Sequence, residues 1–274
     1  MVINADSAQV YADLAVLSAR PTAEDMQGIE HRLFGTWNGA DSCSAADWAT
    51  AATREIAELH AEGAVPIVVG GTGLYIRTLL EGIAPVPEID PAIRTEVREM
   101  ALHRAYTALT REDPERAKAL HPTDTTRIAR ALEVVRSTGQ TLGSWQSEKQ
   151  GAIGEAVALH PAILLPDRAW LYERCDLRFA RMLENGAMTE VEALLARGLA
   201  LDMPVMRAIG VRDIAAYLRG ECSLERARDQ GAQATRNYVK RQMTWLRHQP
   251  PAGWTRIEAQ YFNEDELFAL LLQD

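Results

Sequence analysis

The stretch SAADWATAATREIAELHAEGAVPIVVGGTGLYIRTLLEG, residues 44–82, predicts the fold of this chain. Its first part has helical spacing of apolar residues, with Ser44 as a suitable N-cap and Gly63 where a C′ residue belongs. The run VPIVV, residues 65–69, is β-branched and too short for a helix, and its apolarity predicts a strand buried on both faces. A glycine turn and a second helix follow. Helix, strand and helix in this order predict a parallel α/β sheet.

A second predicted strand opens the chain in MVINADSAQVY and ends just before Asp6. In open parallel sheets ligands bind beyond the carboxyl ends of the strands, so we expect Asp6 and Thr72, which follows VPIVV, to share one edge. Asp6, Ser7 and Gln9 offer a carboxylate, a hydroxyl and an amide, which could hold a nucleobase edge or take a proton from an amine. The alternative is that Asp6 is a turn or helix-cap residue.

The GGTG turn at residues 70–73 also has two interpretations. It could bind an anion at a helix N-terminus, or it could allow a helix to pack tightly on the sheet. The Walker A pattern G-x-x-x-x-G-K-[ST] occurs nowhere in the 274 residues.

The middle of the chain has a different pattern. After PVPEIDP, residues 85–91, the pattern is helical up to Gly139, with Asp113 and Thr123 as candidate N-caps. We therefore expect a helical insertion domain at 88–140 within a core domain formed by 1–87 and 141–274.

The remainder predicts a loose stretch, one more strand and several helices. LGSWQSEKQGAIGEA, residues 142–156, is the loose stretch, and AVALHPAILLP, residues 156–166, contains the strand. The helices are expected at 168–185, 187–197, 208–219, 223–247 and 264–272.

Composition excludes several classes of protein. The chain is 47% hydrophobic and 24% charged, and its apolar runs are far shorter than the roughly 20 residues that a membrane helix needs, so we expect a cytoplasmic protein without membrane association. The three cysteines show no C-x-x-C spacing, which argues against a disulfide framework or a zinc site. The net charge of −9 argues against indiscriminate coating of nucleic acid, yet residues 204–248 carry nine basic and four acidic side chains.

Arginines recur at helical spacing in three places. Arg127 and Arg130 share one face of the helix RIARALEVVR, and Arg178 lies on a similar face of the helix predicted from residue 168. Arg178 is a candidate for binding a diphosphate, the alternative being ordinary ion pairs with neighbouring acidic residues. In TRNYVKRQMTWLRH, residues 235–248, cations alternate with Tyr238 and Trp245, which suits phosphates and unstacked bases. An amphipathic helix with solvated cations would give the same pattern.

Eight stretches in order resemble the tRNA dimethylallyltransferase family, also called the IPP transferase family. They are DSAQVY (6–11), SARPTAED (18–25), HRL (31–33), CSAADW (43–48), PIVVGGTGLYIRTLLEGIAPVP (66–87), HPTDTTRIARALEVVRSTG (121–139), MRAIGVRDIAAYLRGECSLERA (206–227) and ATRNYVKRQMTWLRH (234–248). The resemblance covers nearly the whole chain.

The resemblance implies a reaction and its residues. Asp6 would be the general base that takes a proton from the N6 amine of the adenosine beside the anticodon, as this amine attacks dimethylallyl diphosphate. Thr72 would lie near the reacting groups, Mg²⁺ would neutralise the departing diphosphate, and Asp6 would also contact the tRNA. Further positions match segments that contact tRNA in the family: Ser7, Ala8, Gln9, Arg94, Thr126, Arg127, Ile128, Ala129, Arg130, Arg207, Ala208, Ile209, Gly210, Val211, Arg212, Lys240, Arg241, Gln242, Met243, Thr244, Trp245, Leu246 and Arg247.

The chain departs from the family at its start. Family members have a strand, a G-P-T-A-S-G-K-[ST] loop and a helix ahead of the D-S-x-Q motif, and the loop holds the diphosphate. The expected fold is therefore a P-loop NTPase-like, nucleotide-kinase-like parallel sheet that is N-terminally truncated by roughly 30 residues, the size of a βα unit. Such a truncation would impair transfer.

Two other functions remain open from the sequence. The chain could be a tRNA-binding remnant without catalytic activity, or a small-molecule nucleotide kinase or adenylate prenyltransferase with the same sheet. No protein partner is expected, and the chain is expected to be a monomer.

Overall fold

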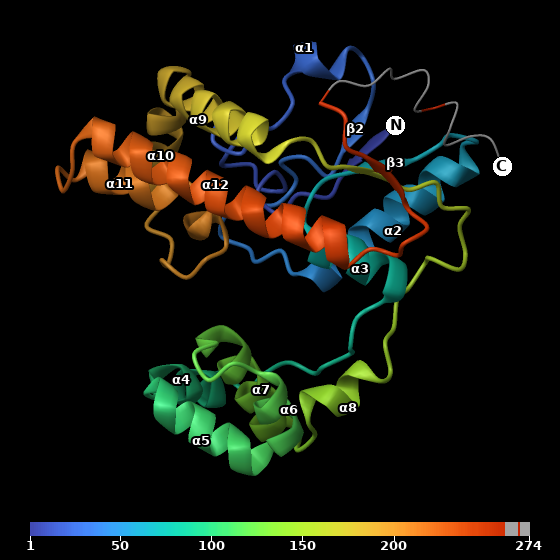
Figure 1. Cartoon of the computed structure of the whole chain (residues 1–274), viewed down its shortest axis with the longest axis vertical. Coiled ribbons are helices and arrows are strands. Elements are labelled where there is room, and N and C mark those ends of the chain that lie inside the picture. Colours follow the sequence, from blue (N-terminus) through green and yellow to red (C-terminus); the bar gives the residue numbers. More distant parts are fainter. Residues whose placement is uncertain (261–267, 269–274) are drawn as a thin grey trace. The chain divides into compact units, whose positions relative to one another are not determined.

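The computed structural model describes residues 1–260 and Phe268 (Figure 1). The chain divides into two compact units, one made of Met1–Leu79 with Gly154–Asp274 and the other of Leu80–Ile153. The sequence-based domain boundaries, between 87 and 88 and between 140 and 141, both fall inside the second unit.

The first unit contains a parallel sheet of three short strands. β1 (Val2–Asn4) is central, with β2 (His31–Arg32) on one side and β3 (Ile67–Val69) on the other. A separate parallel pair joins β4 (Ala162–Leu164) to β5 (Thr255–Ile257). The prediction of an α/β fold with a parallel sheet is confirmed.

Helix α2 (Ala45–Ala61) packs on the central strand. Ser44 caps it in a capping box with Asp47, as its sequence predicts, and Gly63 adopts a left-handed φ of 72° just beyond its end. The buried Trp48 donates a hydrogen bond from Nε1 to the carbonyl oxygen of Asn4, at 2.8 Å. The helix therefore fixes the end of β1, from which the DSAQ segment leaves. Two shorter helices belong to this region: α1 (Ala23–Met26) and α3 (Gly73–Glu81).

Four helices and one 3-10 turn lie between β4 and β5. They are α9 (Arg168–Glu184), α10 (Ala187–Ala196), η1 (Val205–Arg207), α11 (Val211–Leu218) and α12 (Leu224–His248). The long helix α12 packs along α9 and α11 (Figure 1). The helix expected from 208 begins at 211 instead, because Gly210 has a φ of 91°, which ends the preceding turn.

β3 corrects one expectation. Its residues Ile67, Val68 and Val69 are 38%, 37% and 52% exposed, so the prediction of a strand buried on both faces is wrong. Ile67 donates to the carbonyl oxygen of Met1 and Val69 accepts from the N–H of Ala5, each at 2.8 Å, so the backbone groups of Val68 face the opposite side. Among residues 1–260 no strand pairs with that opposite edge, and the side chains on the two faces of β3 are only partly covered.

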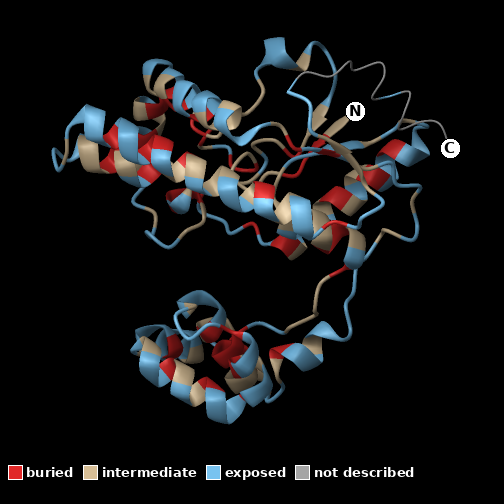
Figure 2. Cartoon of the chain, viewed as in Figure 1, coloured by how far each residue is buried: buried red, intermediate tan, exposed pale blue. Residues whose placement is uncertain are grey.

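The second unit is helical. It comprises α4 (Pro91–Glu99), α5 (Leu102–Glu112), α6 (Pro114–Ala119), α7 (Thr125–Thr138) and α8 (Leu142–Gln146). Leu109 of α5 and Ile128 and Leu132 of α7 are fully buried in its core (Figure 2).

The ends of these helices test the predicted caps. Asp113 caps α6 as predicted, and Gly139 ends α7 with a φ of 72°. The N-cap of α7 is Asp124 and not Thr123, since the Asp124 side chain accepts from the N–H of Arg127. α8 lies within the stretch expected to be loose.

None of the helices in the described part of the chain is long and apolar enough to span a membrane. The helix predicted at 264–272 falls, apart from Phe268, outside the described residues.

Candidate active site

In the turn after β1, one carboxylate oxygen of Asp6 accepts hydrogen bonds from backbone N–H groups, and the other oxygen remains available. Asp6 Oδ1 accepts from the N–H groups of Ala8 at 2.8 Å and Gln9 at 3.3 Å. The fully buried side chain of Asn4 stabilises the turn. It accepts a hydrogen bond from the N–H of Asp6 at 2.8 Å and donates one to the Asp6 carbonyl oxygen at 3.1 Å. Within the described residues Oδ2 of Asp6 accepts no hydrogen bond. The turn interpretation and the functional one are therefore compatible.

Thr72 connects the ends of β1 and β3. Its Oγ1 accepts from the N–H of Ser7 at 3.0 Å and donates to the Ser7 hydroxyl at 3.3 Å. This confirms that Asp6 and Thr72 lie at one sheet edge. Tyr238 of α12 lies close to Asp6 as well. Burial raises the pKa of its hydroxyl group, and the nearby Asp6 carboxylate raises this pKa further.

A cavity of about 500 Å³ opens beside this edge. Polar residues at the DSAQ turn form one part of its lining, and apolar side chains of α9, α12 and the 204–209 segment form another, including Phe179, Met182, Ile209 and Val239. An apolar pocket with a few polar groups is the usual form of a small-molecule site.

Three arginines line the cavity without an ion-pair partner in the described residues: Arg178 of α9, Arg207 of η1 and Arg241 of α12. Arg241 lies over the ring of Tyr238, with 5.7 Å between its guanidinium carbon and the ring centroid. Asp6 is the one acidic residue of the lining. The cavity therefore has excess positive charge, which suits an anionic ligand.

Two cysteines line the cavity as well. Burial is the main cause that raises the pKa of both thiols, Cys43 and Cys175. They therefore stay protonated and are poor nucleophiles.

The GGTG turn is a packing feature in this structure. A Cβ atom at Gly71 would lie 1.7 Å from Gln242 Nε2, and one at Gly73 would lie 2.4 Å from the Trp245 ring. A Cβ atom at Gly70 would lie 2.3 Å from the backbone of Ala5. The glycines thus allow the turn to approach both β1 and α12, which favours the packing interpretation.

The structure brings together only part of the predicted site. The predicted residues that line the cavity are Asp6, Ser7, Ala8, Arg178, Arg207, Ala208, Ile209, Arg241 and Gln242. The predicted residues with exposed positions elsewhere on the first unit are Arg212, Lys240, Thr244 and Arg247.

Several residues that were predicted to contact RNA are buried or pack against other parts of the protein. Val211 and Met243 are 1% and 3% exposed, Gly210 is buried, and Leu246 packs beside Met243. Trp245 lies against Gly73 and under Arg77, 5.8 Å from its guanidinium carbon. The structure gives these positions a packing role, because helical periodicity turns every third or fourth residue of a segment inward. Their contact with RNA stays a prediction.

Gln9 is also placed differently from its prediction. It does not line the cavity, and its amide Nε2 donates to the carbonyl oxygens of Ser18 and Ala19, at 3.1 Å each. Gln9 therefore holds a neighbouring loop.

Other residues of the cavity were not predicted as site residues. These residues come from segments far apart in sequence, and the sequence around each of them is typical of ordinary core residues. They are Tyr11, Phe179, Met182 and Tyr238. Only the alternation of aromatic and cationic residues in 235–248 pointed to Tyr238.

The second unit has a basic group of its own. The buried carboxylate of Glu133 accepts from Arg98 at 3.0 Å and pairs with Arg130 at 3.8 Å. Burial lowers the pKa of Arg130, and the nearby positive charges of Arg94 and Arg98 lower it further, which places all three arginines together. Arg127 and Thr126 are exposed on α7, Ala129 is half-buried, and Ile128 is a core residue.

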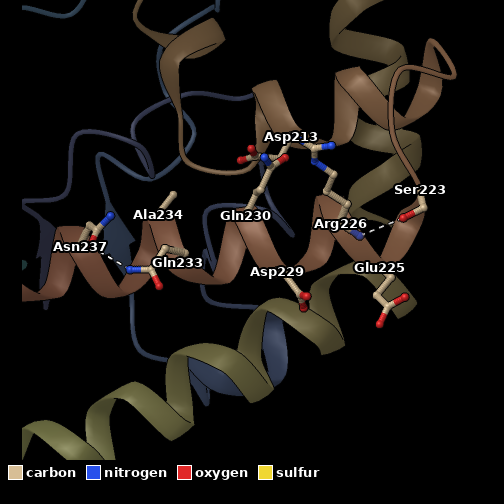
Figure 3. A pocket seen from close by; sticks show the side chains of 9 residues that line it. All are labelled: Asp213, Ser223, Glu225, Arg226, Asp229, Gln230, Gln233, Ala234 and Asn237. Atoms are coloured by element: carbon tan, nitrogen blue, oxygen red, sulfur yellow. Dashed lines mark hydrogen bonds between the residues drawn. The ribbon is translucent and has the colours of Figure 1, made fainter.

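A second pocket, of about 560 Å³, lies at the surface between α11 and α12 (Figure 3). Its lining mixes Asp213, Glu225 and Asp229 with Arg226, and in Figure 3 Arg226 and Gln230 point toward Asp213. Burial raises the pKa of Asp213. The pocket has no net cationic character and is the weaker candidate.

The described part of the chain holds no group of three or more His, Cys, Asp or Glu residues that could bind a metal ion. The cavity offers one carboxylate, that of Asp6, so a Mg²⁺ ion there would take most of its ligands from a bound diphosphate and from water.

Comparison with known proteins gives a consistent result. The family model described as "IPP transferase" matches residues 9–249. A tRNA dimethylallyltransferase of Erythrobacter litoralis is 61% identical over 273 residues, with 100% of this chain and 86% of the relative covered. One of Novosphingobium aromaticivorans is 65% identical over 258 residues, with 94% of this chain and 92% of the relative covered.

Solved structures agree with the sequence relatives. A tRNA isopentenylpyrophosphate transferase of Bacillus halodurans matches with a TM-score of 0.68 and 30% identity, over 98% of this chain and 85% of that one. A eukaryotic dimethylallyltransferase acting on tRNA matches with a TM-score of 0.73 and 26% identity, over 89% of this chain and 63% of that one.

Proposed function

The chain belongs to the IPP transferase family, and on this premise we propose that it is a tRNA dimethylallyltransferase. It would transfer the dimethylallyl group of dimethylallyl diphosphate to N6 of the adenosine adjacent to the anticodon. Relatives with that name at 61% and 65% identity support the proposal. The structural observation that carries it is one cavity in which a carboxylate oxygen of Asp6 and three arginines have no hydrogen-bonded or ion-pair partner among the described residues.

The reaction assigns a role to Asp6. The N6 nitrogen forms a bond to the allylic carbon, the bond from that carbon to the diphosphate oxygen breaks, and the diphosphate leaves with the electron pair. The proton lost from N6 goes to the Asp6 carboxylate. An aromatic amine is a weak nucleophile, so a carboxylate within hydrogen-bond distance lowers the barrier. Asp6 is suited to this because Oδ1 is fixed by two backbone N–H groups while Oδ2 remains available.

Thr72 and Ser7 have a supporting role in this proposal. Their mutual hydrogen bonds, at 3.0 and 3.3 Å, fix the backbone on which Asp6 lies relative to β3. A base that is held in place avoids the entropic cost of orienting it during each turnover.

The arginines of the cavity would stabilise negative charge. Arg178, Arg207 and Arg241 can donate to the diphosphate or to the phosphates that flank the target base, and the apolar wall at Phe179 and Met182 suits the five-carbon chain. The reacting adenosine must leave its stack to reach Asp6, as bases do in other enzymes that modify them.

Recognition of the rest of the tRNA would involve cations on both units. Arg212, Lys240 and Arg247 belong to the first unit, and the group of Arg94, Arg98 and Arg130 belongs to the second. Contacts to phosphates supply affinity without reading sequence.

Two expectations stay predictions. Mg²⁺ is one, and because the cavity does not supply a protein-held site for it, no step above passes through the metal. The truncation expected from the sequence is the other, and the relatives do not confirm it. A monomeric state is likewise untested.

The test is direct. The 274-residue protein is incubated with unmodified tRNA and dimethylallyl diphosphate, the tRNA is digested, and the nucleosides are analysed by mass spectrometry. We expect the dimethylallyl mass on adenosine from the anticodon loop. Binding of tRNA without this product would instead favour a tRNA-binding protein without transferase activity, which the comparisons do not favour.

A further inference from the structure

One wall of the cavity is a loop without regular secondary structure. Leu17 and Ser18 line the cavity, and they belong to residues 14–19, which form turns and bends with no strand or helix. Ala19 has a left-handed φ of 54°, which is uncommon for a residue with a side chain. Turn hydrogen bonds hold part of the loop, such as that from the N–H of Ala19 to the carbonyl oxygen of Val16 at 3.0 Å, and contacts from other segments hold the rest.

The main contact comes from Glu190 on α10. Its carboxylate accepts three backbone N–H groups in a row: Oε1 accepts from Ala15 at 2.6 Å and from Val16 at 2.7 Å, and Oε2 accepts from Leu17 at 2.9 Å. Hydrogen bonds to an ionised acceptor are short and strong. Three successive N–H groups that converge on one carboxylate leave the backbone little freedom.

Two further contacts hold the loop at its ends. Gln9 donates to the carbonyl oxygens of Ser18 and Ala19. At the other end Arg197, just after α10, pairs with Asp13, whose Oδ2 accepts from the N–H of Gly39 at 2.8 Å. Glu190 of α10 and Arg197 just after it therefore hold the segment from Asp13 to Leu17 at two points. The contacting residues are separated by 173 to 184 positions in sequence.

Leu17 is part of the apolar wall of the cavity. A Cβ atom on Gly210 would lie 2.9 Å from Leu17 Cδ1 and 2.8 Å from the ring of Phe179. Leu17 and Phe179 thus meet across Gly210, and a shift of the loop moves Leu17 relative to this apolar wall.

We propose that Glu190 is a positioning residue for prenyl transfer: it fixes the 14–19 loop so that Leu17 and Ser18 hold the substrates in reactive alignment with Asp6. The inference rests on the proposed function. Glu190 itself does not line the cavity, so it acts through the loop. Small misplacements of reacting groups have large effects on rate, which makes such a distant residue important.

Glu190→Gln tests this with little change in size. An amide offers one acceptor oxygen and turns an NH₂ group toward N–H donors, so at least one of the three hydrogen bonds is lost. We expect kcat to fall by about tenfold or more, since alignment is lost. KM for tRNA should stay within about twofold, because phosphate contacts carry most of the affinity. Amide hydrogen exchange at Ala15, Val16 and Leu17 should become faster than in the wild type.

The matched control is Glu192→Gln, an exposed carboxylate on the same helix, which should leave kcat and the exchange rates unchanged. Glu190→Asp keeps the charge and both acceptor oxygens, and it should give an intermediate kcat. Rates are normalised to the folded fraction, measured by circular dichroism.

Each outcome decides between explanations. An unchanged kcat per folded molecule in Glu190→Gln, or a loss confined to KM for tRNA, overturns the inference. The inference is also overturned if the loss of activity is explained entirely by a smaller folded fraction, because Glu190 would then have only a structural role. If the wild type itself transfers no prenyl group, the proposed function has failed rather than this step.

Discussion

The hydroxyl group of Thr72 accepts a hydrogen bond from the backbone N–H of Ser7, at 3.0 Å, across 65 positions of sequence. This contact joins the carboxyl end of β3 to the turn that carries Asp6. Because β1 and β3 are parallel, their ends meet at one edge, and two short polar motifs become one site.

Asp6→Asn separates the two roles of Asp6. Asparagine keeps an Oδ1 that can accept from the N–H groups of Ala8 and Gln9, so the turn should persist, while the proton acceptor is lost. We expect kcat for prenyl transfer to fall by at least about 10²-fold, the lower range for general base catalysis, with tRNA affinity nearly unchanged. Rapid-quench kinetics and filter binding measure the two quantities.

The control for this substitution is Asp202→Asn, an exposed position outside the cavity, which should behave as the wild type. A large loss of tRNA affinity in Asp6→Asn would show that Asp6 is a recognition residue instead of a base.

The unpaired arginines predict a charge effect on substrate binding. Replacing Arg178, Arg207 or Arg241 singly by Gln removes a charge-assisted hydrogen bond, which contributes about 1.5–3 kcal/mol. KM for dimethylallyl diphosphate or for tRNA should therefore rise by about tenfold or more, since about 1.4 kcal/mol corresponds to tenfold. Steady-state kinetics with each substrate varied in turn assign each arginine to one ligand.

Arg219→Gln is the matched control, because Arg219 is exposed and paired with Glu221 at 2.6 Å in the same basic region. We expect less than a twofold change. If all three cavity arginines could be replaced without effect, the cavity would not be the anion site.

Two buried tyrosines, Tyr11 and Tyr75, and the half-buried Tyr238 predict a loss of stability at alkaline pH. Burial is the main cause that raises the pKa of Tyr11, Tyr75 and Tyr238 above the ordinary value of 10.0. A raised pKa in the folded state means that the neutral hydroxyl is favoured there. This contribution is complete below about pH 10 and is lost as the pH rises through the folded-state values. The urea concentration at the midpoint of unfolding should be constant between about pH 7 and about pH 9 and should fall above about pH 10.

The tyrosinate absorbance gives the check. In the native protein these residues should ionise only together with unfolding, and Tyr238→Phe should reduce the alkaline loss of stability. Ionisation of all tyrosines near their ordinary pKa in a protein that stays folded would contradict the prediction.

Gly231→Ala should destabilise the first unit although it improves helix propensity. A Cβ atom at this position of α12 would lie 2.0 Å from the ring of Phe179, and overpacking of this kind costs about 1–3 kcal/mol. The comparison is Gly143→Ala in α8, where the nearest atom would be 3.8 Å away and a gain of about 0.5–1 kcal/mol is expected. Urea denaturation measures both, and equal effects would mean that the Phe179 ring moves aside freely.

Local patterns predicted much of this structure. The N-cap Ser44 predicted the start of α2, and helical periodicity predicted a helix at 223–247, close to α12, because these signals depend on neighbours in sequence. The pairing of Asp6 with Thr72 followed from a general rule about parallel sheets. The position of Gly210 was missed as a helix boundary because a single glycine does not reveal its φ.

Contacts between distant segments could not be predicted in the same way. Nothing near Glu190 in sequence indicates that it binds N–H groups of residues 15–17. Phe179 looks like any core residue of an amphipathic helix, and only the fold places it at a cavity. The apolarity of β3 predicts a strand, but a pattern does not say whether another element covers it.

The uncovered edge of β3 has a consequence for how the protein responds to heat. Val68 presents an N–H and a C=O group beside exposed apolar side chains, and such an edge can pair with the same edge of another molecule. Partly unfolded molecules should then aggregate before they refold, so thermal inactivation would follow a rate and not an equilibrium. We expect the apparent melting temperature to rise with scan rate and to fall with protein concentration, and Val68→Lys on this edge to weaken both dependences.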